Sequence, residues 1–230
     1  MRVYAKNYNV ITETNAGEAA EQQMHAAPLR WLAHIVSFIF HPLFVPVYIT
    51  LFVLYVHPLL FAGYSDLMKV RLTATIFVNL SLLPAITVFL CWRLKFINSM
   101  YMDTQKERFI PLAAAMIFYF WGWYVLRMNE GVPEIYREFL LGCFIAIIGG
   151  WLANIAFKVS LHALAVGGLF CFMLLLMFNA EGGSAKYFAV GIALAGLVCS
   201  SRLIVSSHRP FEVYAGFLIG VISQGLAVLI

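Results

Sequence analysis

The sequence predicts an all-α, polytopic membrane protein built as a bundle of about six to seven transmembrane helices. Composition is the first reason: 63% of the 230 residues are hydrophobic and 11% are charged, whereas soluble domains carry about 25% charged residues. The second reason is that apolar residues gather in runs of about 18 to 26, long enough to cross the ~30 Å hydrocarbon core as helices. Within lipid, an open chain satisfies its backbone polar groups only as a helix.

The polar residues 1–30 predict an N-terminal tail, and residues 31–230 predict a single transmembrane helical domain. The net charge of +4 comes without a basic stripe, which argues against nucleic-acid binding and leaves the bilayer as the expected surroundings. We expect a multi-pass protein of the cell (inner) membrane. The predicted spans cover 31–56, 72–92, 109–126, 139–157, 161–178, 187–204 and 211–230.

Local features support these spans. The first is interrupted at His41 and Pro42, which either line a cavity or mark a kink, and the kink is the favoured interpretation. Only the tripeptide Lys-Val-Ser separates the fourth span from the fifth, so these two are expected to be antiparallel neighbours. Gly216 and Gly220 give the last helix a small-residue face suited to close packing.

When each run crosses the membrane once, three polar clusters fall on the same face. They are Asp103 to Arg108, then Lys158 with Ser160 and His162, and finally Arg202 to Glu212. The loops of the opposite face carry no comparable grouping of histidine and arginine. A charge at the centre of a membrane helix costs roughly 2.5–3.5 kcal/mol, so such residues lie at the edge or have a function. We therefore expect the three clusters to converge on one site.

The cluster from Arg202 to Glu212 has a spacing suited to nucleophilic chemistry. Glu212 lies four residues after His208, so its carboxylate can accept the ring N–H, select the tautomer and stabilise the imidazolium. The other ring nitrogen is then free to act as a nucleophile. Pro210 disfavours helical geometry at Arg209, which predicts a helix that begins only after His208. The alternative is a solvated loop whose arginines contact lipid headgroups.

The other two clusters offer groups that suit a phosphate. Ser160 is a natural N-cap that places His162 in the first turn of a helix, where free N–H groups and the helix dipole attract anions. Lys158 adds positive charge, and protonated His162 can serve as a general acid. Lys106 and Arg108 precede the third span. Each cluster also has a simpler interpretation. The cluster with His162 is then a capped helix with an interfacial histidine, and Lys106 and Arg108 are basic side chains that snorkel to the headgroups.

The segment SRLIVSSHRPFE resembles the third signature of the type 2 phosphatidic acid phosphatase superfamily of membrane lipid phosphatases, Ser-Arg-x5-His-x3-Asp. Its serine, arginine and histidine match in identity and spacing, and Glu212 stands in place of aspartate. VSLH is similar to the second signature, Pro-Ser-Gly-His, at Ser160 and His162. KERFIP keeps residue types of the first signature, Lys-x6-Arg-Pro, at a different spacing. Taken together, the three segments resemble a divergent, Bacteroidetes-like member of the superfamily.

The resemblance implies a metal-independent phosphatase that hydrolyses a lipid phosphate or diphosphate, of prenyl or glycerolipid type, without a cofactor. The expected partners are thus a phosphorylated membrane lipid and the bilayer. His208 is then the phosphorylated nucleophile, oriented by Glu212, and His162 protonates the leaving group. The residues implied to hold the phosphate are Arg202, Ser160, Lys106, Arg108 and Lys158.

Two other functions compete with hydrolysis. A lipid-phosphate binding or transport protein uses the same basic residues without breaking a bond, and the departures from the signatures at Leu161 and Glu212 favour it slightly. A structural membrane protein carries only interfacial charges. Asp103 and Glu107 have no second acidic motif beside them, which argues against a magnesium site and a metal-dependent prenyl transferase.

Overall fold

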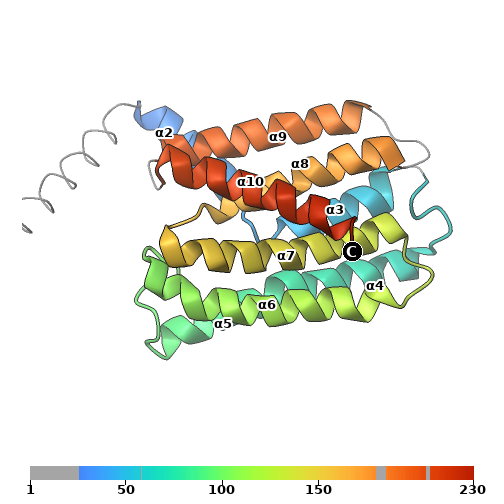
Figure 1. Ribbon diagram of the computed structural model, residues 1–230, viewed down its shortest axis with the longest axis horizontal. Coiled ribbons are helices and arrows are strands. Elements are labelled where there is room, and N and C mark those ends of the chain that lie inside the picture. The colour runs from blue at the N-terminus through green and yellow to red at the C-terminus, as the bar shows by residue number, and fades with distance from the viewer. Residues whose placement is uncertain (1–25, 58, 180–184, 206–207) are drawn as a thin grey trace, which may run out of the picture.

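The computed structural model describes residues 26–57, 59–179, 185–205 and 208–230, and every regular element in these ranges is helical (Figure 1). The predicted N-terminal tail therefore lies outside the described residues as far as residue 25. Within these ranges six helices are long and apolar enough to cross a membrane, which confirms the all-α, polytopic bundle. They are Asp66–Arg93, Gln105–Arg127, Glu134–Ala156, Leu161–Phe178, Ala185–Ile204 and Pro210–Ala227.

The first of these six helices is continuous but not uniform. It consists of α4 (Asp66–Ile76), a π-helical stretch (Phe77–Leu82) and α5 (Leu83–Arg93). The wider turn of the π-helical stretch ends at Leu82, two residues before Pro84, whose ring and missing N–H disturb the preceding helical turn. The helices that follow are α6 (Gln105–Arg127), α7 (Glu134–Ala156), α8 (Leu161–Asn179), α9 (Ala185–Ile204) and α10 (Pro210–Ala227). As expected from the short connection, α7 and α8 are packed neighbours.

The span predicted over 31–56 is broken into two helices, which corrects the expectation of one kinked span. It begins earlier, with α2 (Ala27–Ile39), and resumes as α3 (Val45–Leu51) with a π-helical end at Phe52–Val56. Pro42 lies within the break, where it has no N–H to continue the helical hydrogen bonds. α2 packs against α9, whereas α3 packs against α4 and α8 inside the bundle.

The broken backbone finds new hydrogen-bond partners, as an apolar environment requires. The hydroxyl of Tyr48 donates to the carbonyl of Ile39 at 2.8 Å. The hydroxyl of Ser81 donates to the carbonyl of Leu43. The second half of the broken segment is held in the core as well, because the hydroxyls of Thr50 and Tyr136 lie 2.7 Å apart.

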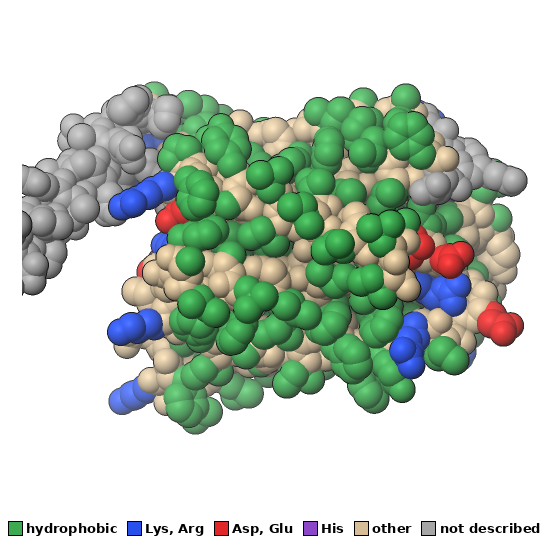
Figure 2. All heavy atoms as spheres, viewed as in Figure 1, with side chains coloured by type: hydrophobic (Ala, Val, Ile, Leu, Met, Phe, Trp, Pro, Cys, Tyr) green, Lys and Arg blue, Asp and Glu red, His purple; other side chains and the backbone are tan. Residues whose placement is uncertain are grey.

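The surface shows which ends of the bundle face water. In Figure 2 apolar side chains cover the middle of the molecule, and the lysine, arginine and acidic side chains gather at its two ends. The first residues of α6, α8 and α10 lie at the same end in Figure 1, which we call the site face. The three polar clusters therefore share one membrane face, as the count of crossings predicted.

Among the glycines of the described residues, the closest contact between helices joins α8 and α10. A Cβ added to Gly220 would lie 2.1 Å from the carbonyl oxygen of Leu164, and one added to Gly216 would lie 2.6 Å from that of Ser160. The two backbones therefore touch, and no larger residue fits at either glycine. This confirms the packing interpretation of the glycine face on the last helix. It also brings the first residues of α8 and α10 together at the site face.

We expect Gly220→Ala to lower the free energy of unfolding by about 1–3 kcal/mol, because the added methyl forces the α10 backbone away from α8. Gly225→Ala on the same helix is the matched control, since an added Cβ there meets nothing within 4 Å. The control variant should be as stable as the wild type or more stable, because alanine favours helix by up to about 1 kcal/mol over glycine. Unfolding of the purified proteins in mixed micelles measures both effects. Equal stability of the two variants would contradict the proposed role of the contact.

Candidate functional site

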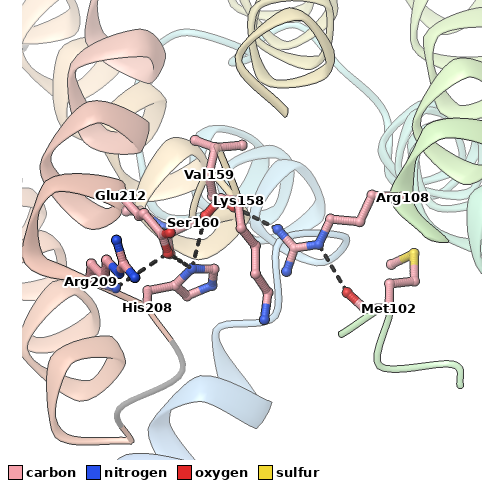
Figure 3. A network of polar contacts seen from close by, with 9 residues as sticks. Met102, Arg108, Lys158, Val159, Ser160, His208, Arg209 and Glu212 are labelled. Carbon is pink, nitrogen blue, oxygen red and sulfur yellow. Dashed lines mark hydrogen bonds and ion pairs between the residues drawn. The ribbon is translucent and has the colours of Figure 1, made fainter. Parts of the chain in front are cut away.

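The three polar clusters meet at the site face through backbone carbonyls of the α7–α8 turn (Figure 3). Arg108 at the start of α6 donates from Nη1 to the carbonyl of Val159 at 2.7 Å. Nδ1 of His208, just before α10, lies 3.1 Å from the carbonyl oxygen of Lys158. We call the assembled group the cationic cluster. Its members are Arg108, Lys158, His162, Arg202, His208 and Glu212.

The ring of His208 is held in one tautomer. Its Nδ1 lies 2.9 Å from Oε2 of Glu212 and 3.1 Å from the Lys158 carbonyl, and both partners only accept hydrogen bonds. Nδ1 therefore carries the hydrogen, and Nε2 keeps its lone pair. The side chain is 3% exposed, so this orientation is enforced by packing as well. The predicted relation between His208 and Glu212 is present.

The start of α10 explains how this contact forms. The helix begins at Pro210, and Arg209 before it is extended, with ψ of 151°. His208 is thus outside the helix, as the position of the proline predicted. Oε2 of Glu212 also accepts the backbone N–H of Arg209 at 3.3 Å, so one carboxylate both caps the helix and orients the histidine. The carbonyl of Glu212 accepts the N–H of Ser160 at 3.2 Å, which ties α10 to α8.

Arg108 and Lys106 differ in their surroundings. The Arg108 side chain is buried, and its Nε donates to the carbonyl of Met102 at 3.0 Å in addition to the Nη1 bond to Val159. This guanidinium therefore ties the α5–α6 loop to the α7–α8 turn while it supplies a positive charge. Lys106 is exposed, and among the described residues the structure does not bring it into the cationic cluster.

The loop that carries Met102 is ordered by Glu107. Its carboxylate accepts the backbone N–H of Asn98 at 2.9 Å and that of Thr104 at 3.2 Å, and Thr104 caps α6 in return. This acidic residue is therefore a structural cap, with both oxygens occupied.

Ser160 and His162 begin α8 as the sequence predicted. The hydroxyl of Ser160 accepts the N–H of Ala163 at 3.4 Å, which is the bond of an N-cap, and the residue is fully buried. The Nε2 of His162 donates to the carbonyl of Ser37 in α2 at 2.9 Å. The second ring nitrogen, Nδ1, is therefore the one left for a ligand. His162 lies within electrostatic range of both Arg202 and His208.

The cluster carries more positive than negative charge. Arg202, Arg108 and Lys158 are three cations close enough to interact with His208, while Glu212 is the carboxylate in contact with the ring. Nε of Arg202 is buried and has no hydrogen-bond partner in the described part of the chain. Burial and the neighbouring Arg108 lower the pKa of Lys158, although it remains a cation of the group. Glu212 and Asp103 act on Arg108 and Lys158 as negative charges, so two carboxylates face three cations. A site with such an excess of positive charge favours an anion.

Two residues beside the site are not among the predicted site residues, although lining a cavity was the less favoured interpretation of His41. Ser37 accepts a hydrogen bond from Nη1 of Arg202 on its hydroxyl, at 3.2 Å, and one from His162 on its carbonyl. The ring centroid of His41 lies 5.6 Å from that of His162. The signal in the sequence was the break at His41 and Pro42, for which a kink was the favoured explanation. The structure shows a helix break and a histidine facing the site at the same place.

Comparison with known proteins adds no further guide, because the chain matches no protein-family model, no curated protein and no solved structure. The chemistry of the cationic cluster is therefore the ground for any proposal about function.

We expect Arg108→Ala to lower the free energy of unfolding by about 2–4 kcal/mol, because two carbonyls lose a charged hydrogen-bond donor at a buried position. Lys106→Ala, two residues away on the exposed side of the same helix, should change stability by no more than about 0.5 kcal/mol. Unfolding of both variants in the same micelles provides the comparison. Equal losses would show that Arg108 does not tie the loops together.

Stability should also depend on pH through His208. Burial first, and then the positive charges of Arg108, Arg202 and Lys158, lower the pKa of this histidine from its ordinary value of 6.5. Below about pH 6.5 the unfolded chain takes up a proton here that the folded chain resists, so the folded state loses stability as the pH falls.

His208→Asn removes this pH-dependent contribution. Between about pH 7.5 and about pH 5, the wild type should lose about 2 kcal/mol more unfolding free energy than the variant. Parallel loss in both proteins would mean that the folded histidine titrates normally.

Proposed function

We propose that the chain is an integral-membrane phosphatase of the cell inner membrane that hydrolyses a lipid phosphate or diphosphate, of prenyl or glycerolipid type. The reaction proceeds through a phosphohistidine on His208 and needs no metal. This assigns the chain to the type 2 phosphatidic acid phosphatase superfamily as a divergent member. The bilayer surface delivers the substrate, whose headgroup lies at the depth of the site face.

One observation carries the proposal: a neutral imidazole, whose Nε2 has no hydrogen-bond partner among the described residues, lies among three cations at a membrane face. The lowered pKa of His208 keeps the ring unprotonated at neutral pH, which a nucleophile requires. Glu212 holds the opposite nitrogen and stabilises the positive charge that develops when Nε2 forms a bond. The surrounding cations stabilise the negative charge of the phosphoryl group during its transfer. In phosphoryl transfer such charge stabilisation supplies most of the catalysis.

In the first step, the lone pair of Nε2 of His208 forms a bond to phosphorus while the bond from phosphorus to the lipid oxygen breaks. The leaving oxygen takes a proton from Nδ1 of the imidazolium form of His162. The Nε2–H of that ring stays on the carbonyl of Ser37, so the histidine ends the step neutral and in a defined tautomer.

In the second step, water attacks phosphorus and the bond from phosphorus to Nε2 breaks. The electron pair of that bond returns to His208, and a proton of the water passes to Nδ1 of His162. Inorganic phosphate leaves, and both histidines regain their starting protonation states.

A second candidate, binding or transport of a lipid phosphate without hydrolysis, is favoured by the contact of His162. A neutral imidazole has one N–H, and that of His162, on Nε2, donates to the carbonyl of Ser37. The neutral ring therefore has no proton to offer a leaving group. The same cations then serve only to hold the headgroup.

His208→Ala should abolish phosphate release from lipid phosphates presented in mixed micelles, with a loss of at least about 1000-fold in kcat, because the nucleophile is removed. His34→Ala is the matched control, since His34 is an exposed histidine on α2 outside the cationic cluster. This control should keep the wild-type rate.

Labelled lipid phosphate distinguishes the two candidates. Acid-labile label on wild-type protein, absent from the His208 variant, supports hydrolysis. Tight binding of the lipid with no release of phosphate between about pH 5 and about pH 8 would replace the phosphatase with the binding protein.

A further inference from the structure

Two side chains of the cationic cluster donate hydrogen bonds to a single residue outside it. Ser37, near the C-terminal end of α2, accepts Nη1–H of Arg202 on its hydroxyl at 3.2 Å and Nε2–H of His162 on its carbonyl at 2.9 Å. The serine is 6% exposed, so water does not compete freely for either bond. No other residue in the described ranges joins the start of α8 to the end of α9 through such a pair of hydrogen bonds.

The break in the first transmembrane segment makes the carbonyl available. α2 ends at Ile39, and the last carbonyls of a helix have no partner within it. The N–H of Phe40 donates to the carbonyl of Val36. The next carbonyl in the chain, that of Ser37, accepts the hydrogen bond from His162. A helix C-terminus carries partial negative charge, so it favours a donor ring and stabilises positive charge on it.

The hydroxyl acts differently from a carboxylate at the same place. Among the described residues no acidic side chain forms an ion pair with Arg202, and its Nε has no partner. A neutral hydroxyl therefore fixes the direction of the guanidinium but leaves its charge uncompensated. An acidic partner in this position would hold the side chain as well but would cancel the charge that attracts an anion.

We propose that Ser37 is a positioning residue of the site: it aims Arg202 and His162 together at the phosphate of a phosphomonoester headgroup. The broken first segment is thus part of the functional machinery, because the break places the hydroxyl and the free carbonyl beside the cluster. The inference rests on the proposed function only in that the cluster binds a phosphate-like anion. It holds for hydrolysis and for binding alike.

The test uses the full chain in detergent micelles, with orthovanadate as a phosphate-like probe in a direct binding measurement. Ser37→Ala should raise the dissociation constant about tenfold, the effect of one lost hydrogen bond to a charged group. Ser37→Thr restores the hydroxyl and should stay within about twofold of the wild type. Ser223→Ala, which removes a buried serine hydroxyl on α10 about 20 Å along the helix from the site, is the control and should bind as the wild type does.

A double-variant cycle separates positioning from general loss of structure. If Ser37 acts through Arg202, then Ser37→Ala should weaken binding no further once Arg202→Ala is present. A further tenfold loss in the Arg202→Ala background, or unchanged binding by Ser37→Ala alone, overturns the inference and leaves the proposed function intact. A wild-type protein that binds neither orthovanadate nor inorganic phosphate overturns the proposed function itself.

Discussion

The contact between the backbones of α8 and α10 is the constraint on which the site depends. Packed helices normally keep their axes about 8–10 Å apart, at a distance set by the side chains between them. At Gly216 and Gly220 no side chain intervenes, and the carbonyls of Ser160 and Leu164 occupy the space of a missing Cβ. This close approach allows the N–H of Ser160 to reach the carbonyl of Glu212, so the first turns of two helices form one unit. A histidine from each helix start then faces the same region of the membrane surface.

The positive charges of this unit are held by dipoles more than by opposite charges. Arg108 donates to carbonyls of two loops, and Arg202 donates to the hydroxyl of Ser37. The acceptors lie in the α5–α6 loop, in the α7–α8 turn and, for the Ser37 hydroxyl, in the last turn of α2. Helix ends leave carbonyls without partners, and these carbonyls accept hydrogen bonds without neutralising the donor. The fold thereby orients cations and keeps their charge, which is the property that an anion site needs.

Much of the architecture and part of the site followed from the sequence. The lengths of the apolar runs predicted the crossings and their parity, and the spacing of His208, Pro210 and Glu212 predicted both the helix start and the ring contact. The role of Ser37 could not be predicted, because a backbone carbonyl has no sequence signature and a lone serine on an apolar helix has many uses. The difference between Lys106 and Arg108 was also hidden, since both are cations at one helix start and only the rotation of the helix decides which is buried.

The sequence by itself determined that the chain crosses the membrane several times and that its polar clusters gather at one face. These properties follow from hydrophobicity and from the need of every backbone group in lipid for a hydrogen bond, which act on each segment separately. Only the tertiary structure decided which groups touch. That outcome depends on helix rotation, on the close approach that two glycines permit, and on where the carbonyls freed by helix ends meet donors from distant segments.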